Sequence, residues 1–148
     1  MKNLTTTKNI ISLIISLAMM FLIGATKANN EIYTLSGVVT GCSSKNPIHV
    51  LLYNEAVFKD MAHIQENIYQ PDKSGECSVP YMLEVQKGSY VVAAFEDKNK
   101  NNKLDFFFFI PKEPSGFFRK FSGMSAPKFD KLKFDVDGNI VDANVELQ

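Results

Sequence analysis

Short runs of β-branched and aromatic residues recur along the chain with turn residues between them, and helical periodicity is nearly absent. This pattern constrains the fold more than any other feature, because it leaves little of the chain for helices. The clearest predicted strands are Ile32–Thr40, Ile48–Tyr53, Ser78–Val85 and Ser89–Phe95. Pro80 should lie on an edge strand or at a bulge, since proline cannot donate to a ladder. Many short strands with regular turns predict an all-β sandwich.

The C-terminal part of the chain predicts a hairpin. Apolar and polar residues alternate over 132–136 and again over 141–147, and Asp137-Gly138 between them fits a two-residue type I′ turn. The segment Glu55–Glu66 is the one stretch that could hold a helical turn or two. We therefore expect at most a short helix beside the strands.

The first 28 residues have the features of a signal peptide. Lys2 and Lys8 precede Ile10–Ile23, an apolar run of 14 residues that includes two serines. This run is shorter than the ~20 residues of a membrane-spanning helix, and Thr26 and Ala28 then fit a cleavage site. We predict a signal peptide at 1–28 and a single β-sandwich domain at 29–148, periplasmic or secreted. The alternative is an uncleaved membrane anchor.

The net charge of the chain bears on which classes of molecule it could bind. The chain has a formal net charge of zero, and removing 1–28, which holds three lysines and no acid, leaves 13 basic and 16 acidic side chains. The resulting net charge of about −3 argues against a nucleic-acid partner. After signal cleavage no stable membrane span would remain. The expected partner is an unidentified protein or a component of the cell envelope.

The chain contains two cysteines, Cys42 and Cys77. In an oxidising compartment two cysteines of one folded domain usually pair, so we predict a disulfide that closes a loop of 34 intervening residues. A metal site would need closer ligand spacing than these cysteines and His49 and His63 offer, and a redox pair would normally be C-x-x-C.

The segment after Ser89–Phe95 has the spacing of a calcium loop. Oxygen-bearing groups fall at relative positions 1, 3, 5, 7 and 9, namely Asp97, Asn99, Asn101, the backbone carbonyl of Lys103, and Asp105. Position 6 is Asn102 instead of glycine, and position 12 is Phe108 instead of a bidentate glutamate. Calcium affinity should be weak, with water, Glu96 or Glu113 completing the shell. The alternative is an Asx-rich loop whose side chains cap their own backbone.

Aromatic residues are concentrated just beyond this loop. Four consecutive phenylalanines cannot all enter a one-sided core, because alternate residues of a strand point to opposite faces. The sequence therefore leaves two alternatives, an exposed interaction patch or a second apolar layer beneath the long loop Lys112–Lys128. The candidate residues are Phe106, Phe107, Phe108, Phe109, Phe117 and Phe118.

Enzymatic signatures are absent from the sequence. It contains no G-x-S-x-G, P-loop, H-E-x-x-H or dinucleotide fingerprint. His49 and His63 are interpreted as surface or partly buried packing residues. A hydrolase would have to use carboxylates of the loop region, which are Glu96, Asp97, Asp105 and Glu113.

The stretch GSYVVAAFEDKNKNNKLD, the later Pro111, Glu113, Gly116 and Phe117, and Pro127 with Phe129 resemble the bacterial exported proteins called domain of unknown function 2141. The similarity runs from about Ser36 to Leu147 and departs at Asn102, where glycine is usual, at Phe109 and at Phe118-Arg119. The resemblance implies a prealbumin-like, seven-stranded Greek-key β-sandwich and implies no activity. We expect an exported, non-catalytic binding or structural module that requires no cofactor and has calcium as a candidate ligand. The hydrolase is the alternative.

Overall fold

The computed structural model describes residues 31–43, 45–72, 76–108, 110–121 and 126–148. The predicted signal peptide and Phe109 lie outside these residues. In the described part of the chain no helix is long and apolar enough to cross a membrane.

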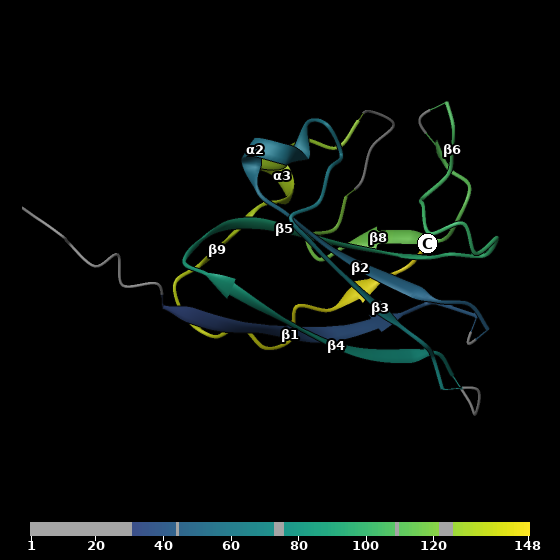
Figure 1. Cartoon of the computed structure of the whole chain (residues 1–148), viewed down its shortest axis with the longest axis horizontal. Coiled ribbons are helices and arrows are strands. Elements are labelled where there is room, and N and C mark those ends of the chain that lie inside the picture. The colour runs from purple at the N-terminus through teal and green to yellow at the C-terminus, as the bar shows by residue number, and fades with distance from the viewer. Residues whose placement is uncertain (1–30, 44, 73–75, 109, 122–125) are drawn as a thin grey trace, which may run out of the picture.

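The protein is mostly β, with two large sheets and one small one (Figure 1). The three-stranded sheet has the order β10 (Val145–Glu146), β1 (Ile32–Thr40), β4 (Ser78–Gln86). The five-stranded sheet has the order β3 (Gln65–Tyr69), β2 (Ile48–Tyr53), β5 (Gly88–Glu96), β8 (Ser115–Phe117), and β9 (Phe134–Val136) also pairs with β5. The small sheet pairs β6 (Phe106–Phe107) with β7 (Ile110–Pro111). The described residues thus form ten strands in three sheets, where the family resemblance implied a seven-stranded sandwich.

The inner core lies between the two large sheets. On β4 every second residue is buried, as expected for a strand with one face toward water. Its buried residues pack with residues from β1, β2 and β5, so the two sheets face each other in a sandwich-like arrangement. The largest fully buried inner-core side chains are Leu35, Ile48, Leu52 and Leu83.

A second apolar cluster covers the outer face of the five-stranded sheet. All six residues of β2 are buried, so this strand is covered on both faces. The cover includes two short helices, α2 (Glu55–Phe58) and α3 (Phe129–Leu132), which lie over the upper layer in Figure 1. The outer cluster consists of Leu51, Tyr53, Phe58, Val91, Ala93, Phe95, Phe129 and Leu132.

The four clearest predicted strands are confirmed. The bounds of β1 and β2 agree with the prediction, while β4 extends to Gln86 and β5 runs from Gly88 to Glu96. Pro80 lies on β4, the outer strand of its sheet, as the sequence predicts. The segment Glu55–Glu66 forms only the short helix α2, and the polar strand β3 that follows it carried no alternating pattern to reveal it.

The predicted C-terminal hairpin is wrong. β9 pairs with β5 in one large sheet, whereas β10 pairs with β1 in the other, with parallel register Val39↔Val145. A type I′ turn needs positive φ at both central residues, and neither Asp137 nor Gly138 has it. The first half of the run is also partly helical, because Leu132 ends α3. The two apolar runs are buried by different sheets instead of by each other.

Candidate functional site

The loop that follows β5 is built around one buried carboxylate. The Asp97 side chain has no exposed surface, and its two oxygens accept hydrogen bonds from the backbone N–H groups of Asn101 (3.2 Å) and Asn102 (2.8 Å). Asn102 has a φ of 60°, in the left-handed region that asparagine tolerates better than most residues. The chain therefore curls back over Asp97 at the position where a calcium loop has its invariant glycine.

The other predicted ligand side chains converge in the same loop. The side-chain amides of Asn99 and Asn101 both donate to Oδ2 of Asp105, at 2.6 Å and 3.0 Å. Their amide oxygens accept the backbone N–H groups of Asn101 (3.0 Å) and Lys103 (2.9 Å), which are Asx turns. The structure thus brings Asp97, Asn99, Asn101 and Asp105 together, and it contains the self-capping contacts that were the alternative interpretation.

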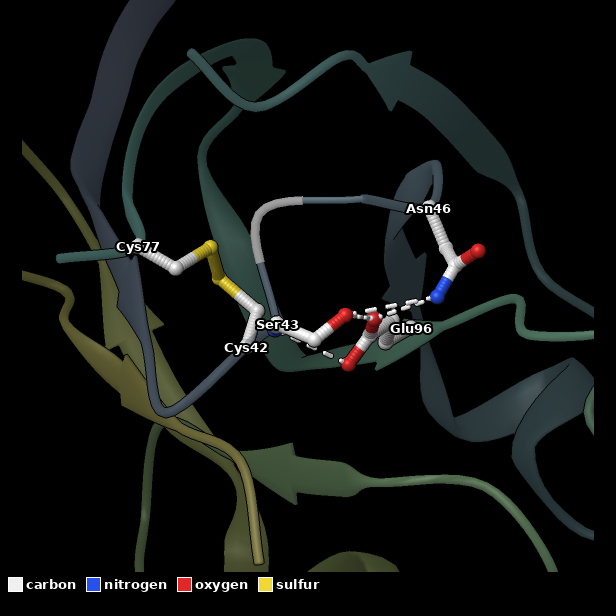
Figure 2. Close-up of a disulfide and its surroundings, with 5 residues drawn as sticks. All are labelled: Cys42, Ser43, Asn46, Cys77 and Glu96. Carbon is white, nitrogen blue, oxygen red and sulfur yellow. Dashed lines mark hydrogen bonds between the residues drawn. A yellow bond between two sulfur atoms is a disulfide. The ribbon is translucent and has the colours of Figure 1, made fainter. Parts of the chain in front are cut away.

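Of the two carboxylates outside the loop, only Glu113 bonds to it among the described contacts. Its oxygens accept the backbone N–H groups of Lys98 (2.9 Å) and Asp105 (3.2 Å), so it holds the two ends of the loop together. Glu96 points elsewhere and accepts hydrogen bonds from Ser43 and Asn46 (Figure 2). Glu113 is therefore the outside carboxylate that lies against the loop and holds it closed.

The predicted disulfide joins Cys42 to Cys77 next to this Glu96 cluster (Figure 2). Their Cα atoms are 5.3 Å apart, within the usual range for a disulfide. The bond follows directly on the β1–β4 ladder, whose last pair is Thr40↔Ser78. Its place in the fold is structural, where it joins the ends of two paired strands.

The number of carboxylates near the loop limits what it can bind. Within the described residues, no group of three or more His, Cys, Asp or Glu side chains is arranged to hold a metal ion. Any cation in the loop would depend on amide and backbone oxygens besides the carboxylates of Asp97 and Asp105.

A buried histidine lies directly beneath the loop. His49 has no exposed surface, its Nδ1 lies 2.7 Å from Glu66 Oε1, and its ring stacks on Phe95 with centroids 4.5 Å apart. Its Nε2 lies 3.6 Å from Oδ2 of Asp97 and has no hydrogen-bond partner within the described residues. The interpretation of His49 as a surface or partly buried residue is wrong, because the side chains of Glu66, Phe95 and Asp97 lie against its ring.

A shallow cavity of about 220 Å³ lies beside the loop on the outer face of the five-stranded sheet. Leu51, Tyr53 and Phe95 contribute apolar surface from β2 and β5, and Glu66 and Lys103 contribute charge. His63, whose Nε2 is 3.5 Å from Glu66, also lines it. Glu66 could not be identified from the sequence. Its contact with His49 exists because β3 pairs with β2 in one particular register, and nothing local in the chain indicates that register.

The phenylalanines divide into two groups. Phe106, Phe107 and Phe108 are exposed by 44%, 62% and 82%. Phe117 packs against the outer cluster, and Phe118 lies edge-to-face with Phe134 against the inner core. Among the described phenylalanines of this set, the first group is exposed, and Phe117 and Phe118 are half-buried against the packed layers.

Comparison with known proteins gives one relationship. No curated protein and no solved structure matches the chain. The sequence profile of one bacterial family matches residues 38–144, which is most of the chain and includes the loop, the disulfide and both large sheets except for the first part of β1 and all of β10. The chain therefore belongs to the family of uncharacterised proteins conserved in bacteria that is called domain of unknown function 2141.

Proposed function

We propose that the protein is an exported, non-catalytic binding module whose loop at residues 97–105 binds Ca²⁺ weakly. The observation that carries this proposal is the closure of the loop on buried Asp97, with a left-handed residue at the sixth position. Asn99, Asn101 and Asp105 then line the same loop. A cation would replace the amide hydrogens now directed at Asp105, and a rotation of each amide would present its oxygen instead.

The composition of the loop determines its affinity for Ca²⁺ and its preference for Ca²⁺ over Mg²⁺. Two carboxylates are few for Ca²⁺, and the exposed lysines Lys98, Lys100 and Lys103 reduce the local negative charge. Affinity should therefore be in the millimolar range of extracellular modules. Mg²⁺ should bind less well, because it requires a tight octahedral shell and gives up its water reluctantly.

The burial of the ionisable groups supports a binding role over the alternative hydrolase. Glu96 and Glu113 are buried and accept hydrogen bonds from neighbouring backbone N–H groups, so both are committed to the fold. His49 has no exposed surface from which to reach a substrate. A general base must lie within hydrogen-bonding reach of the proton that it removes.

Export and the detailed fold type are part of the same proposal. A disulfide between Cys42 and Cys77 suits an oxidising compartment, which supports a periplasmic or secreted location. The chain also passes back and forth between the two large sheets, as it does in Greek-key sandwiches of the prealbumin-like type.

Thermal melts with calcium and with chelator test the loop. Millimolar calcium should raise the melting temperature of the wild type, because a ligand that binds only the folded state stabilises it by mass action. Asp97→Ala should abolish this rise and also lower the baseline, since Asp97 holds two backbone N–H groups. Asp105→Asn should abolish the rise with a smaller change in the baseline.

The matched control is Asp60→Asn, which changes an exposed carboxylate outside the loop. This variant should keep the full response to calcium. If calcium and chelator give the wild type the same melting temperature, the loop is a self-capped turn and the calcium proposal fails.

A further inference from the structure

An apolar hairpin stands next to the loop. β6 and β7 pair through Phe106↔Pro111 and Phe107↔Ile110, and Phe108 lies at the turn with a φ of 57°. Figure 1 shows β6 standing away from the two large sheets, on the side where β5 ends and β8 begins. Phe107, Phe108 and Ile110 are exposed by 62%, 82% and 68%. Contiguous apolar side chains in water are unfavourable and usually mark a contact surface.

Exposed lysines flank this hairpin in the sequence. Lys112 follows β7, and its backbone N–H donates to the carbonyl of Asp105 at 2.8 Å. Lys98, Lys100 and Lys103 belong to the adjoining loop, and all four lysines are exposed.

The acids of the same region are withdrawn from the surface. Asp97 and Glu113 are buried, and Asp105 is half-buried with one oxygen occupied by two amides. The charge that this part of the described chain presents to solvent is therefore mainly positive.

We propose that the tip formed by Phe107, Phe108 and Ile110 inserts into the interface of an anionic lipid membrane, with the four lysines at the level of the headgroups. This inference names the partner of the proposed binding module and rests on that function, but it does not depend on calcium. Aromatic rings together with nearby lysines are the combination that favours such interfaces. A protein partner would need a broader patch, since stable interfaces bury about 800 Å² on each side.

Vesicle co-sedimentation of the exported protein, carried out in chelator, tests the proposal. Vesicles of phosphatidylcholine with added phosphatidylglycerol should bind the wild type, and vesicles of phosphatidylcholine alone should bind it more weakly. The double variant Phe107→Ser/Phe108→Ser should bind at least about tenfold less, because the burial of even one phenylalanine favours partitioning by about that factor. Its melting temperature should match the wild type, since both rings are exposed.

The charge contribution is tested separately. Lys100→Gln/Lys112→Gln should weaken binding to the anionic vesicles by about fivefold for each lysine, with little effect on neutral vesicles. Lys87→Gln is the matched control, because Lys87 precedes β5 and lies at the opposite end of that strand from the loop. It should bind like the wild type.

A second control removes exposed apolar surface elsewhere. Met82 and Val141 are exposed by 59% and 70%, and Met82→Ser/Val141→Ser should leave vesicle binding unchanged. Equal binding of the wild type and Phe107→Ser/Phe108→Ser would overturn the proposal. If that variant instead lost self-association on size exclusion while it bound vesicles normally, the tip would be a protein contact. Because chelator is present throughout, failure of the calcium site would not change either result.

Discussion

Among the described residues, three carboxylates and one histidine are buried, and in each case a specific partner explains how the fold tolerates the side chain. Glu96, Asp97 and Glu113 accept backbone N–H groups, and His49 faces Glu66. Burying a charged or polar group without such partners would cost several kcal/mol. These contacts fix Ser43, Asn46 and the loop 97–105 to the ends of the strands, so the candidate site is held by polar contacts more than by apolar packing.

The pH dependence of stability should include a contribution from Tyr53. Burial, helped by the nearby Glu66, raises the pKa of its hydroxyl from 10.0 to about 12. The contribution is fully present below pH 10, where the hydroxyl is protonated in both states, and it is lost as the pH rises from 10 to 12. Tyr53→Phe should lose stability less steeply over this range in chemical denaturation.

Burial also raises the pKa of Tyr81. The stability of Tyr53→Phe should therefore still fall at alkaline pH, although less steeply than that of the wild type. An identical pH profile for Tyr53→Phe and the wild type would contradict the assignment.

At the residue scale, the sequence revealed those contacts that are local along the chain. Asp97, Asn99, Asn101 and Asp105 could be grouped from spacing alone because a single turn brings them together. His49 and Glu66 could not be paired, since their contact depends on the register of two strands. The residue types alone did not indicate this contact, because a histidine between Ile48 and Val50 is typical of a packing residue.

At the scale of elements, both edges of the sandwich are held by specific contacts. The backbone of Met82 on the outer strand β4 bonds to the Tyr69 hydroxyl of β3, with N–H and carbonyl distances of 3.2 Å and 3.1 Å. At the other edge, Ser115 and Gln148 exchange two backbone hydrogen bonds of 3.3 Å and 3.2 Å. Side chains and chain ends thus occupy positions where an unpaired edge would attract another strand.

Two glycines allow the C-terminal segment to lie close to both sheets. A Cβ on Gly37 of β1 would collide with the carbonyl of Ala143, and one on Gly116 of β8 would collide with that of Glu146. Gly116→Ala should therefore lower the free energy of unfolding by about 1 to 3 kcal/mol, as overpacking does. Chemical denaturation measures this change.

Gly138→Ala provides the control, because nothing lies within 4 Å of a Cβ at that position and its φ is not positive. Its stability should equal or slightly exceed that of the wild type. Equal stabilities for Gly116→Ala and Gly138→Ala would show that β10 does not need the close approach.

Among the elements, the strands with strong apolar content were predictable and the pairings were not. β1, β2, β4 and β5 have enough β-branched and aromatic residues to identify them individually. β3, with the sequence QENIY, acquires its structure from its neighbour β2. The false C-terminal hairpin shows the same limit, since alternation gives the buried face of a strand but not the sheet that buries it.

For the molecule as a whole, the disulfide should be a major source of stability. Cys42→Ser/Cys77→Ser should lower the free energy of unfolding by roughly 3 to 4 kcal/mol in the chain-entropy model, in which the crosslink restricts the unfolded state. Chemical denaturation should give the same loss for the wild type after reduction and alkylation. Intact mass provides the control, and two freely alkylated thiols in the unreduced protein would contradict the pairing.

The sandwich class followed from composition and turn spacing, whereas the arrangement of its strands did not. Strands β1 and β10 pair although Val39 and Val145 lie at nearly opposite ends of the described chain. Nothing local in either segment specifies that contact. The pairing of β1 with β10 is determined by the complete set of buried faces. These include the outer faces of β2 and β5, whose apolar residues belong to the outer cluster.

The parallel pairing of β1 with β10 also makes completion of the inner core depend on residues 143–147. Ala143, Val145 and Leu147 fill part of the inner core, so a nascent chain that has not yet reached them must leave one side of β1 unpaired and the core open. Contacts of such long sequence separation form slowly. The danger of aggregation for this protein therefore lies in its unfinished chain, where the bare edge of β1 is open to strands of other molecules until the final residues arrive.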